Sequence, residues 1–204
     1  MQENFKLIEG LNIDNITGIK SSYTKLNESE ISCVISAEKI KSIISRAVKS
    51  IKKPYFFIEV PCTEAQETEL SKKGDKGLHM QLYNLEVTYD VADAILKRYG
   101  DLLINDGVTN FGFCSLETET EIYVMPFQNI MLYNKSNVNV FENILKEEHI
   151  VKDTPENHIT IDSLLSKNNP ADRTLVELDG ETVFDMIENL KDAGLTLCDI
   201  IKEN

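Results

Sequence analysis

Apolar residues recur at helical spacing in the segment that runs from Ser36 to Lys53. The apolar positions three and four residues apart are Ile40, Ile43, Ile44, Ala47, Val48 and Ile51. Ser36 suits the N-cap position, and Pro54 ends the helix because proline lacks a backbone donor. The opposite face carries lysine and arginine, so we predict an amphipathic helix with its apolar face in the core.

Several later segments have the aromatic and β-branched content, or the alternation, that is typical of strands. Strands are predicted over 55–60, 78–89, 121–125, 130–133 and 174–178. Residues 195–201 fit either a last strand or a short helix. Residues 102–104 and 108–113 flank Asp106-Gly107. Because Asp-Gly is a common two-residue hairpin turn, we predict a hairpin there.

Helical spacing returns between these strands. Helices are predicted over 91–99, 139–149, 161–167 and 181–193. The first is capped by Asp90 and ended by Gly100. Residues 63–77 are polar and read as an exposed loop or a frayed helix. Clustered strands with irregularly placed helices predict an α+β fold with a mostly antiparallel sheet and several packed helices.

The charge is distributed unevenly along the chain. Lysine and arginine number 21 against 34 acidic residues, a net charge of −13. Residues 1–53 carry 9 basic and 6 acidic residues, a net of +3, so residues 54–204 carry −16. We expect one domain over 1–204, with a possible N-terminal subregion 1–53 and a main body 54–204. The negative body repels phosphate, so we expect a basic protein partner and no nucleic acid.

Other classes of protein lack support in the sequence. No apolar run approaches the roughly 18 residues of a membrane helix. The N-terminal residues do not resemble a signal peptide, so we expect a cytoplasmic protein without a membrane partner. The cysteines 33, 62, 114 and 198 form no Cys-x-x-Cys pair, and we expect them to be reduced. Phosphate-binding loops, hydrolase elbows and metal-ligand spacings are missing, so we predict no catalytic residue, metal or cofactor.

Three glutamates at alternate positions, Glu117, Glu119 and Glu121, would share one face of a strand. Such a face must be solvated or meet cations. We predict that these glutamates contact a basic partner, together with Asp101 and Asp106 beside the expected hairpin. The alternative is a solvated strand edge that charge protects from aggregation, with Asp106 as an ordinary turn residue.

The chain resembles bacterial toxin-immunity proteins in its size, its acidity and its content of Asn, Lys and Ile. The segment 102–113, followed by the three glutamates, is part of that resemblance, which extends over residues 55–200. It implies a small acidic protein that binds and neutralises a basic toxin, and it assigns no role to any single residue.

We therefore favour a soluble acidic protein-binding module over an enzyme. Two alternatives stay open. One is a hydrolase with carboxylates near residues 101–113, and the other is a scaffold component of a phage or a secretion system. The oligomeric state stays open as well.

Overall fold

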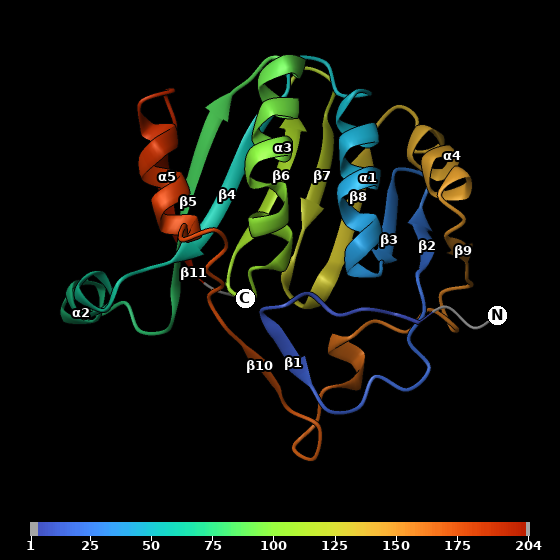
Figure 1. The fold of residues 1–204 in the computed structure, drawn as a ribbon, viewed down its shortest axis with the longest axis horizontal. Helices are drawn as coiled ribbons and strands as arrows, with labels where there is room; N and C mark the ends of the chain where they lie inside the picture. The colour runs from blue at the N-terminus through green and yellow to red at the C-terminus, as the bar shows by residue number, and fades with distance from the viewer. Residues whose placement is uncertain (1–3, 203–204) are drawn as a thin grey trace.

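A computed structural model describes residues 4–202 of the chain. We expect no signal peptide at the N-terminus, and residues 1–3 of that segment lie outside the described range. Nine strands of the described residues form one main sheet. They are β2 (Ser22–Asn27), β3 (Glu30–Val34), β4 (Tyr55–Pro61), β5 (His79–Glu86), β6 (Asn110–Ser115), β7 (Thr120–Val124), β8 (Asn129–Asn134), β9 (Val151–Lys152) and β11 (Thr196–Lys202). The order across the sheet is β11-β5-β4-β6-β7-β8-β3-β2-β9 (Figure 1).

Neighbouring strands of the main sheet are antiparallel, apart from the short parallel contact of β2 with β9. The predicted α+β class with a mostly antiparallel sheet is confirmed. β3 pairs with β8, so residues before and after the charge change at Lys53 contribute strands to the same sheet.

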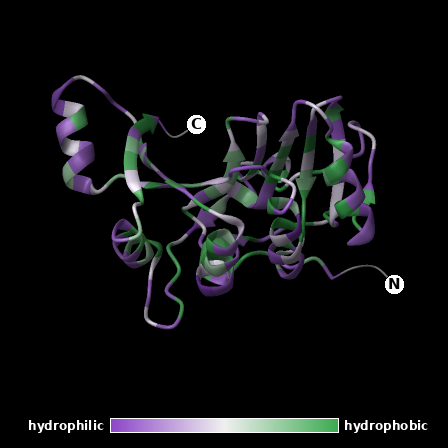
Figure 2. Ribbon diagram, turned by 90° about the horizontal axis from the view of Figure 1, so that it is seen from above, coloured by the Kyte–Doolittle hydropathy of each residue, from purple (hydrophilic) through white to green (hydrophobic). Residues whose placement is uncertain are grey.

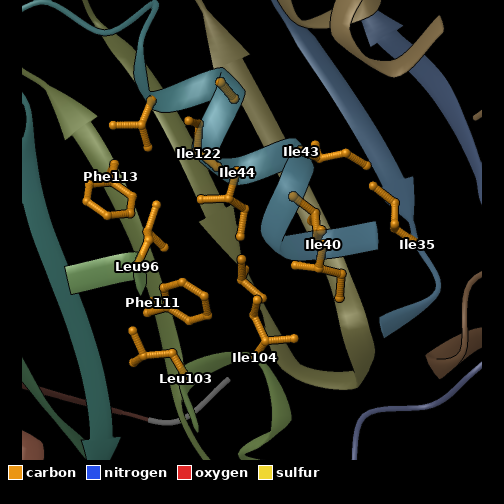
Figure 3. Packing of buried hydrophobic residues seen from close by; sticks show 14 of the residues in the cluster. Ile35, Ile40, Ile43, Ile44, Leu96, Leu103, Ile104, Phe111, Phe113 and Ile122 are labelled. Atoms are coloured by element: carbon orange, nitrogen blue, oxygen red, sulfur yellow. The ribbon is translucent and has the colours of Figure 1, made fainter. Parts of the chain in front are cut away.

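Four helices lie against one face of the main sheet, and Figure 2 shows this layer on a single side. They are α1 (Ala37–Val48), α3 (Tyr89–Asn105), α4 (Asn139–Glu147) and α5 (Val183–Lys191). The predicted apolar face of α1 is buried, as its spacing requires. Figure 3 shows residues of α1 and α3 meeting alternate residues of β6 and β7 in the core. This burial of apolar surface is the main favourable contribution to folding.

The predicted hairpin over 102–113 is wrong. α3 continues to Asn105, and the apolar run 102–104 is the buried last turn of that helix. The predicted stop at Gly100 fails because this glycine lies inside the helix, where a Cβ atom would meet only the flexible Lys41 side chain. A short apolar run fits both a strand and a buried helical turn, and packing against α1 decides for the helix.

Gly107 lies where two backbone segments approach each other closely. Its N–H donates to the Thr174 carbonyl at 3.0 Å, and the Thr174 N–H donates to the Gly10 carbonyl at 2.9 Å. A Cβ atom on Gly107 would lie 1.8 Å from that Gly10 oxygen. This junction adjoins the small pair β1 (Leu11–Ile13) and β10 (Ala171–Arg173). The strand predicted over 174–178 is therefore wrong. The strand in this part of the chain is β10, and its pairing with β1 ends at Arg173.

Helix α2 (Glu64–Lys72) projects beyond the β5–β11 edge of the main sheet, away from the other helices (Figures 1 and 2). It buries no residue. Its attachment is polar: the His79 ring is 2% exposed and lies 2.8 Å from Glu67 and 3.3 Å from Asp75. Lys202 of β11 pairs with the same Asp75 at 2.8 Å. The segment 63–77 thus contains an exposed helix over residues 64–72, and residues 196–202 form the strand β11.

We predict that Gly107→Ala destabilises the protein by more than about 3 kcal/mol, because a methyl group there overlaps backbone that cannot move independently. Gly100→Ala is the control. It adds a methyl group inside a helix, where alanine is favoured over glycine by about 1 kcal/mol. Denaturant unfolding of both variants measures the difference, and equal stabilities would contradict the close approach.

We predict that the attachment of α2 weakens as pH rises. The pKa of His79 is raised, first by its hydrogen bond to Glu67 and further by the charges of Glu67 and Asp75. A raised folded-state pKa stabilises the attachment fully below about pH 6.5, and this contribution is lost as pH passes through the raised value. The pKa values of Glu67 and Asp75 are lowered, so the attachment is also lost in acid, as pH falls through those values.

The measurement is the set of Cα chemical shifts of α2 between about pH 6 and about pH 9. They should move toward unfolded values in the native protein and should show no such step in His79→Gln. Shifts that stay helical over the whole range in the native protein would refute the prediction.

Candidate functional site

The face of the main sheet opposite the helical layer is covered at its β2–β3–β8 end. The His158 ring lies 3.2 Å from the Ser22 hydroxyl and 3.5 Å from the Ser32 hydroxyl. Burial lowers the pKa of His158. Next to it, Ile161 is fully buried and Asp162 accepts a hydrogen bond from Asn129 at 2.8 Å. The segment that contains residues 158–162 therefore covers this end of the face, and the β4–β6–β7 region lies beside it.

β4 supplies the centre of the uncovered region. Its alternation sends Phe56, Ile58 and Val60 into the core and turns Tyr55, Phe57 and Glu59 toward the other face. Two hollows on that face, of about 280 and about 430 Å³, are both lined by Glu59. We call these two hollows together the acidic groove.

Glu59 is 9% exposed, yet its carboxylate is only partly satisfied. Asn110 of β6 donates to Oε2 at 2.9 Å, and the Tyr123 hydroxyl of β7 donates to the same oxygen at 2.7 Å. Among the described residues, none donates to Oε1. Burial, followed by the Glu59 hydrogen bond and charge, raises the pKa of Tyr123, so its hydroxyl stays a donor at neutral pH.

Gly112 makes the floor of the groove possible. It lies between Phe57 and Tyr123 in the sheet register, and the rings of those two residues meet over it with centroids 5.4 Å apart. A Cβ atom on Gly112 would lie 2.6 Å from the Phe57 ring and 2.1 Å from the Ile122 carbonyl oxygen. Any larger residue would displace the ring, so glycine allows the aromatic pair to form.

Glu121 lines the first hollow together with Glu59. Its pKa is raised, first by burial and then by the neighbouring Glu59 carboxylate. Burial and the charge of Glu121 raise the pKa of the adjacent Cys114 to about 11, which keeps this thiol protonated. The four cysteines of the chain are all described and all unpaired.

A strained turn closes the second hollow. Phe127 and Gln128 both have left-handed backbones, with φ of 59° and 61°, in the turn η1 (Pro126–Gln128). Gln128 is buried; it accepts from the Ile8 N–H and donates to the carbonyls of Lys6 and Ile35. These hydrogen bonds offset a cost of about 1–2 kcal/mol per residue. The result is that Phe127 lines the end of the groove.

Of the three glutamates predicted to share a strand face, Glu121 alone lies in the groove. β7 begins at Thr120, so Glu117 and Glu119 belong to the preceding turn, and the predicted common face is wrong. Glu117 pairs with Lys53 at 2.6 Å and Glu119 with Lys135 at 2.5 Å. The physical reason is that the turn interrupts the two-residue period.

The two aspartates of the predicted surface lie elsewhere. Asp101 is on α3 and pairs with Lys41 at 2.9 Å, on the helical side of the sheet. Asp106 is 2% exposed and accepts from the N–H groups of Val108 at 3.0 Å and Val176 at 2.9 Å. It precedes β6, whereas the glutamate turn follows β6, so the structure does not bring the aspartates and glutamates together.

Sequence reasoning missed Glu59, Asn110 and Tyr123. One signal was available, since Glu59 is a charged residue inside the apolar strand that runs from Tyr55 to Val60. A charge in such a strand must find partners or a solvated face. Its actual partners are 51 and 64 residues away in the chain, and only the β4–β6–β7 register brings them together.

The comparisons with known proteins give no assignment: no protein-family model, curated protein or solved structure matches the chain. Within residues 4–202, no three His, Cys, Asp or Glu side chains gather as a set of metal ligands. None of the helices in this range is both long enough and apolar enough to cross a membrane. The chemistry available in the first hollow is that of two carboxylates beside aromatic rings, an arrangement that attracts an organic cation.

We predict that Glu121→Gln stabilises the free protein at neutral pH by up to about 1 kcal/mol. A carboxyl group with a raised folded-state pKa destabilises the fold once pH exceeds the ordinary glutamate value, and glutamine removes that penalty. The gain should vanish below about pH 4. Thermal unfolding at several pH values measures it.

Glu117→Gln is the matched control, because the pKa of Glu117 is shifted in the opposite direction to that of Glu121. Lys53 lowers the pKa of Glu117, so removing this charge should not stabilise the protein at neutral pH. A Glu121→Gln protein less stable than the native protein at neutral pH would contradict the electrostatic cost that we assign to this position.

Proposed function

We propose that the protein is a protein-binding module whose acidic groove receives a basic segment of its partner. The observation that carries this proposal is that Glu59 and Glu121 lie in one hollow without a cationic partner from the part of the chain that the structure describes. Both carboxylates line one hollow on an uncovered sheet face, and among the described residues neither has a cationic partner there.

Charge complementarity favours a basic occupant over an acidic or neutral one. The two exposed glutamates of the turn before β7 are each neutralised by a lysine of the same chain. The two carboxylates of the first hollow have no such partner among the described residues, and the net charge of −13 adds a negative field around them. Such a field steers a basic partner to the surface and speeds association.

The specific form that we propose is an immunity protein that covers a basic toxin of the nuclease type. A broad sheet face with an acidic hollow at its centre suits this task, because it can mask a cationic active site over a wide area. The resemblance in size and acidity to bacterial toxin-immunity proteins supports the same form.

A hydrolase is the second candidate, and the raised pKa of Glu121 is the observation that favours it. A carboxyl group whose pKa is raised by burial and by a second carboxylate is an arrangement found in acid–base catalysis. We place binding first because one Glu59 oxygen already accepts two hydrogen bonds and the first hollow, at about 280 Å³, is small for a substrate pocket.

The test is affinity capture from a lysate of the source organism with three immobilised proteins at about 0.05 M and about 0.5 M salt, which span strong and weak screening. They are the native protein, a Glu59→Gln/Glu121→Gln variant, and the matched control Glu117→Gln/Glu119→Gln, which removes the same charge outside the groove. Both variants are first shown to be folded.

We expect one basic protein to be retained at low salt by the native protein and by the control. The groove variant should retain at least about tenfold less of it. Equal losses from both variants would mean that only global charge acts, and undiminished retention by the groove variant would place the contact elsewhere. Either result contradicts the proposal.

A further inference from the structure

The acidic groove leaves one carboxylate oxygen open at its centre. Both hydrogen bonds that Glu59 accepts converge on Oε2, from Asn110 and from Tyr123. Oε1 belongs to the same side chain, which is 9% exposed and lines both hollows. Among the described residues no side chain donates to Oε1, so a ligand that carries N–H groups can supply a hydrogen bond there.

A second carboxylate lies in the same hollow. Glu121 is close enough for Glu59 to raise its pKa, and among the described residues no side chain donates to it. The two glutamates of the turn before β7, Glu117 and Glu119, each pair with a lysine instead. The hollow therefore presents two acceptors that the chain itself does not satisfy.

The rest of the lining is mostly aromatic and apolar, and it also includes the Asn84 amide and the Cys114 thiol. Tyr55, Phe57, Leu82 and Leu116 line the first hollow with the two carboxylates. Leu116 is 78% exposed, so its side chain is accessible to a ligand in the hollow. Within residues 4–202, the two carboxylates and the Cys114 thiol do not form a set of metal ligands. An organic cation with an apolar stem fits this lining.

We infer that the first hollow is the receptor for a single arginine side chain of the partner, with its guanidinium between Glu59 and Glu121. This inference rests on the proposed function and names the chemistry of its contact. A guanidinium is planar, offers five N–H donors and stacks on aromatic rings, whereas the ammonium of lysine is a strongly hydrated point charge. The hollow of about 280 Å³ lies just below the range of about 300–1,000 Å³ that is usual for small-molecule pockets, and it suits one long side chain.

The test uses the full chain and three probes: Nα-acetyl-arginine amide, Nα-acetyl-lysine amide and Nα-acetyl-citrulline amide. Citrulline keeps the shape of arginine and removes its charge. Binding is followed by the NMR shifts of the Asn110 side-chain amide and of the backbone around Glu121. We expect the arginine probe to bind with a Kd of about 1–10 mM, the lysine probe about fivefold more weakly, and the citrulline probe not measurably.

Variants locate the contact. Glu59→Gln and Glu121→Gln should each weaken the arginine probe at least about fivefold, and Glu117→Gln should leave its affinity unchanged. Glu121→Gln keeps the test valid if Glu59→Gln fails to fold, because Glu121 is less buried and accepts no hydrogen bond from the described residues.

Any of three results would overturn the inference. They are equal affinity for the arginine and lysine probes, citrulline binding as tight as arginine binding, and an unchanged Kd for arginine in Glu121→Gln. These results are separable from failure of the proposed function. A basic partner that still depends on the groove in affinity capture, while the arginine probe does not bind, would keep the binding function and exclude the arginine contact. Loss of both would remove the two proposals together.

Discussion

The carboxylate of Glu59 is the constraint on which the functional face depends. It lies almost buried in the middle of a sheet, and it is tolerated because β6 and β7 each supply one donor to the same oxygen. Burying a charge without such partners would cost several kcal/mol. The register of three strands is therefore fixed by polar contacts on one face and by apolar packing on the other. The other oxygen, Oε1, accepts no hydrogen bond from the described residues.

The remaining features of the groove follow from that placement. Gly112 allows Phe57 and Tyr123 to meet, which orients the Tyr123 hydroxyl toward Glu59. The strained backbone at Phe127 closes the far end, and three hydrogen bonds of Gln128 hold it. Negative charge, strain and exposed apolar surface each reduce stability. Glu59, Glu121 and the strained Phe127 line the two hollows opposite the helical layer, and the binding role that we propose rests on this grouping.

Local patterns in the sequence predict local structure well. The spacing of isoleucines predicts α1 and its buried face, and aromatic and β-branched content predicts β4, because both signals are contained in short segments. The boundary between α3 and β6 was not predictable in the same way, since the run 102–104 fits either element and packing against α1 decides. The groove needs the pairing of β4, β6 and β7, which no local period encodes. Glu121 was predicted as a site residue because glutamates alternate at 117, 119 and 121. The reason was wrong, since Glu117 and Glu119 do not share a strand face with it.

The most direct measurement of the central claim is the pKa of Glu121, followed through its side-chain carboxyl carbon by NMR with and without Nα-acetyl-arginine amide. In the free protein this pKa should lie above the ordinary glutamate value, for the reasons of burial and charge given above. Saturation with the probe should lower it, because a bound cation favours the charged form of the carboxyl group. The same titration curve in both states would contradict the account, since a guanidinium between the two carboxylates cannot leave Glu121 unaffected.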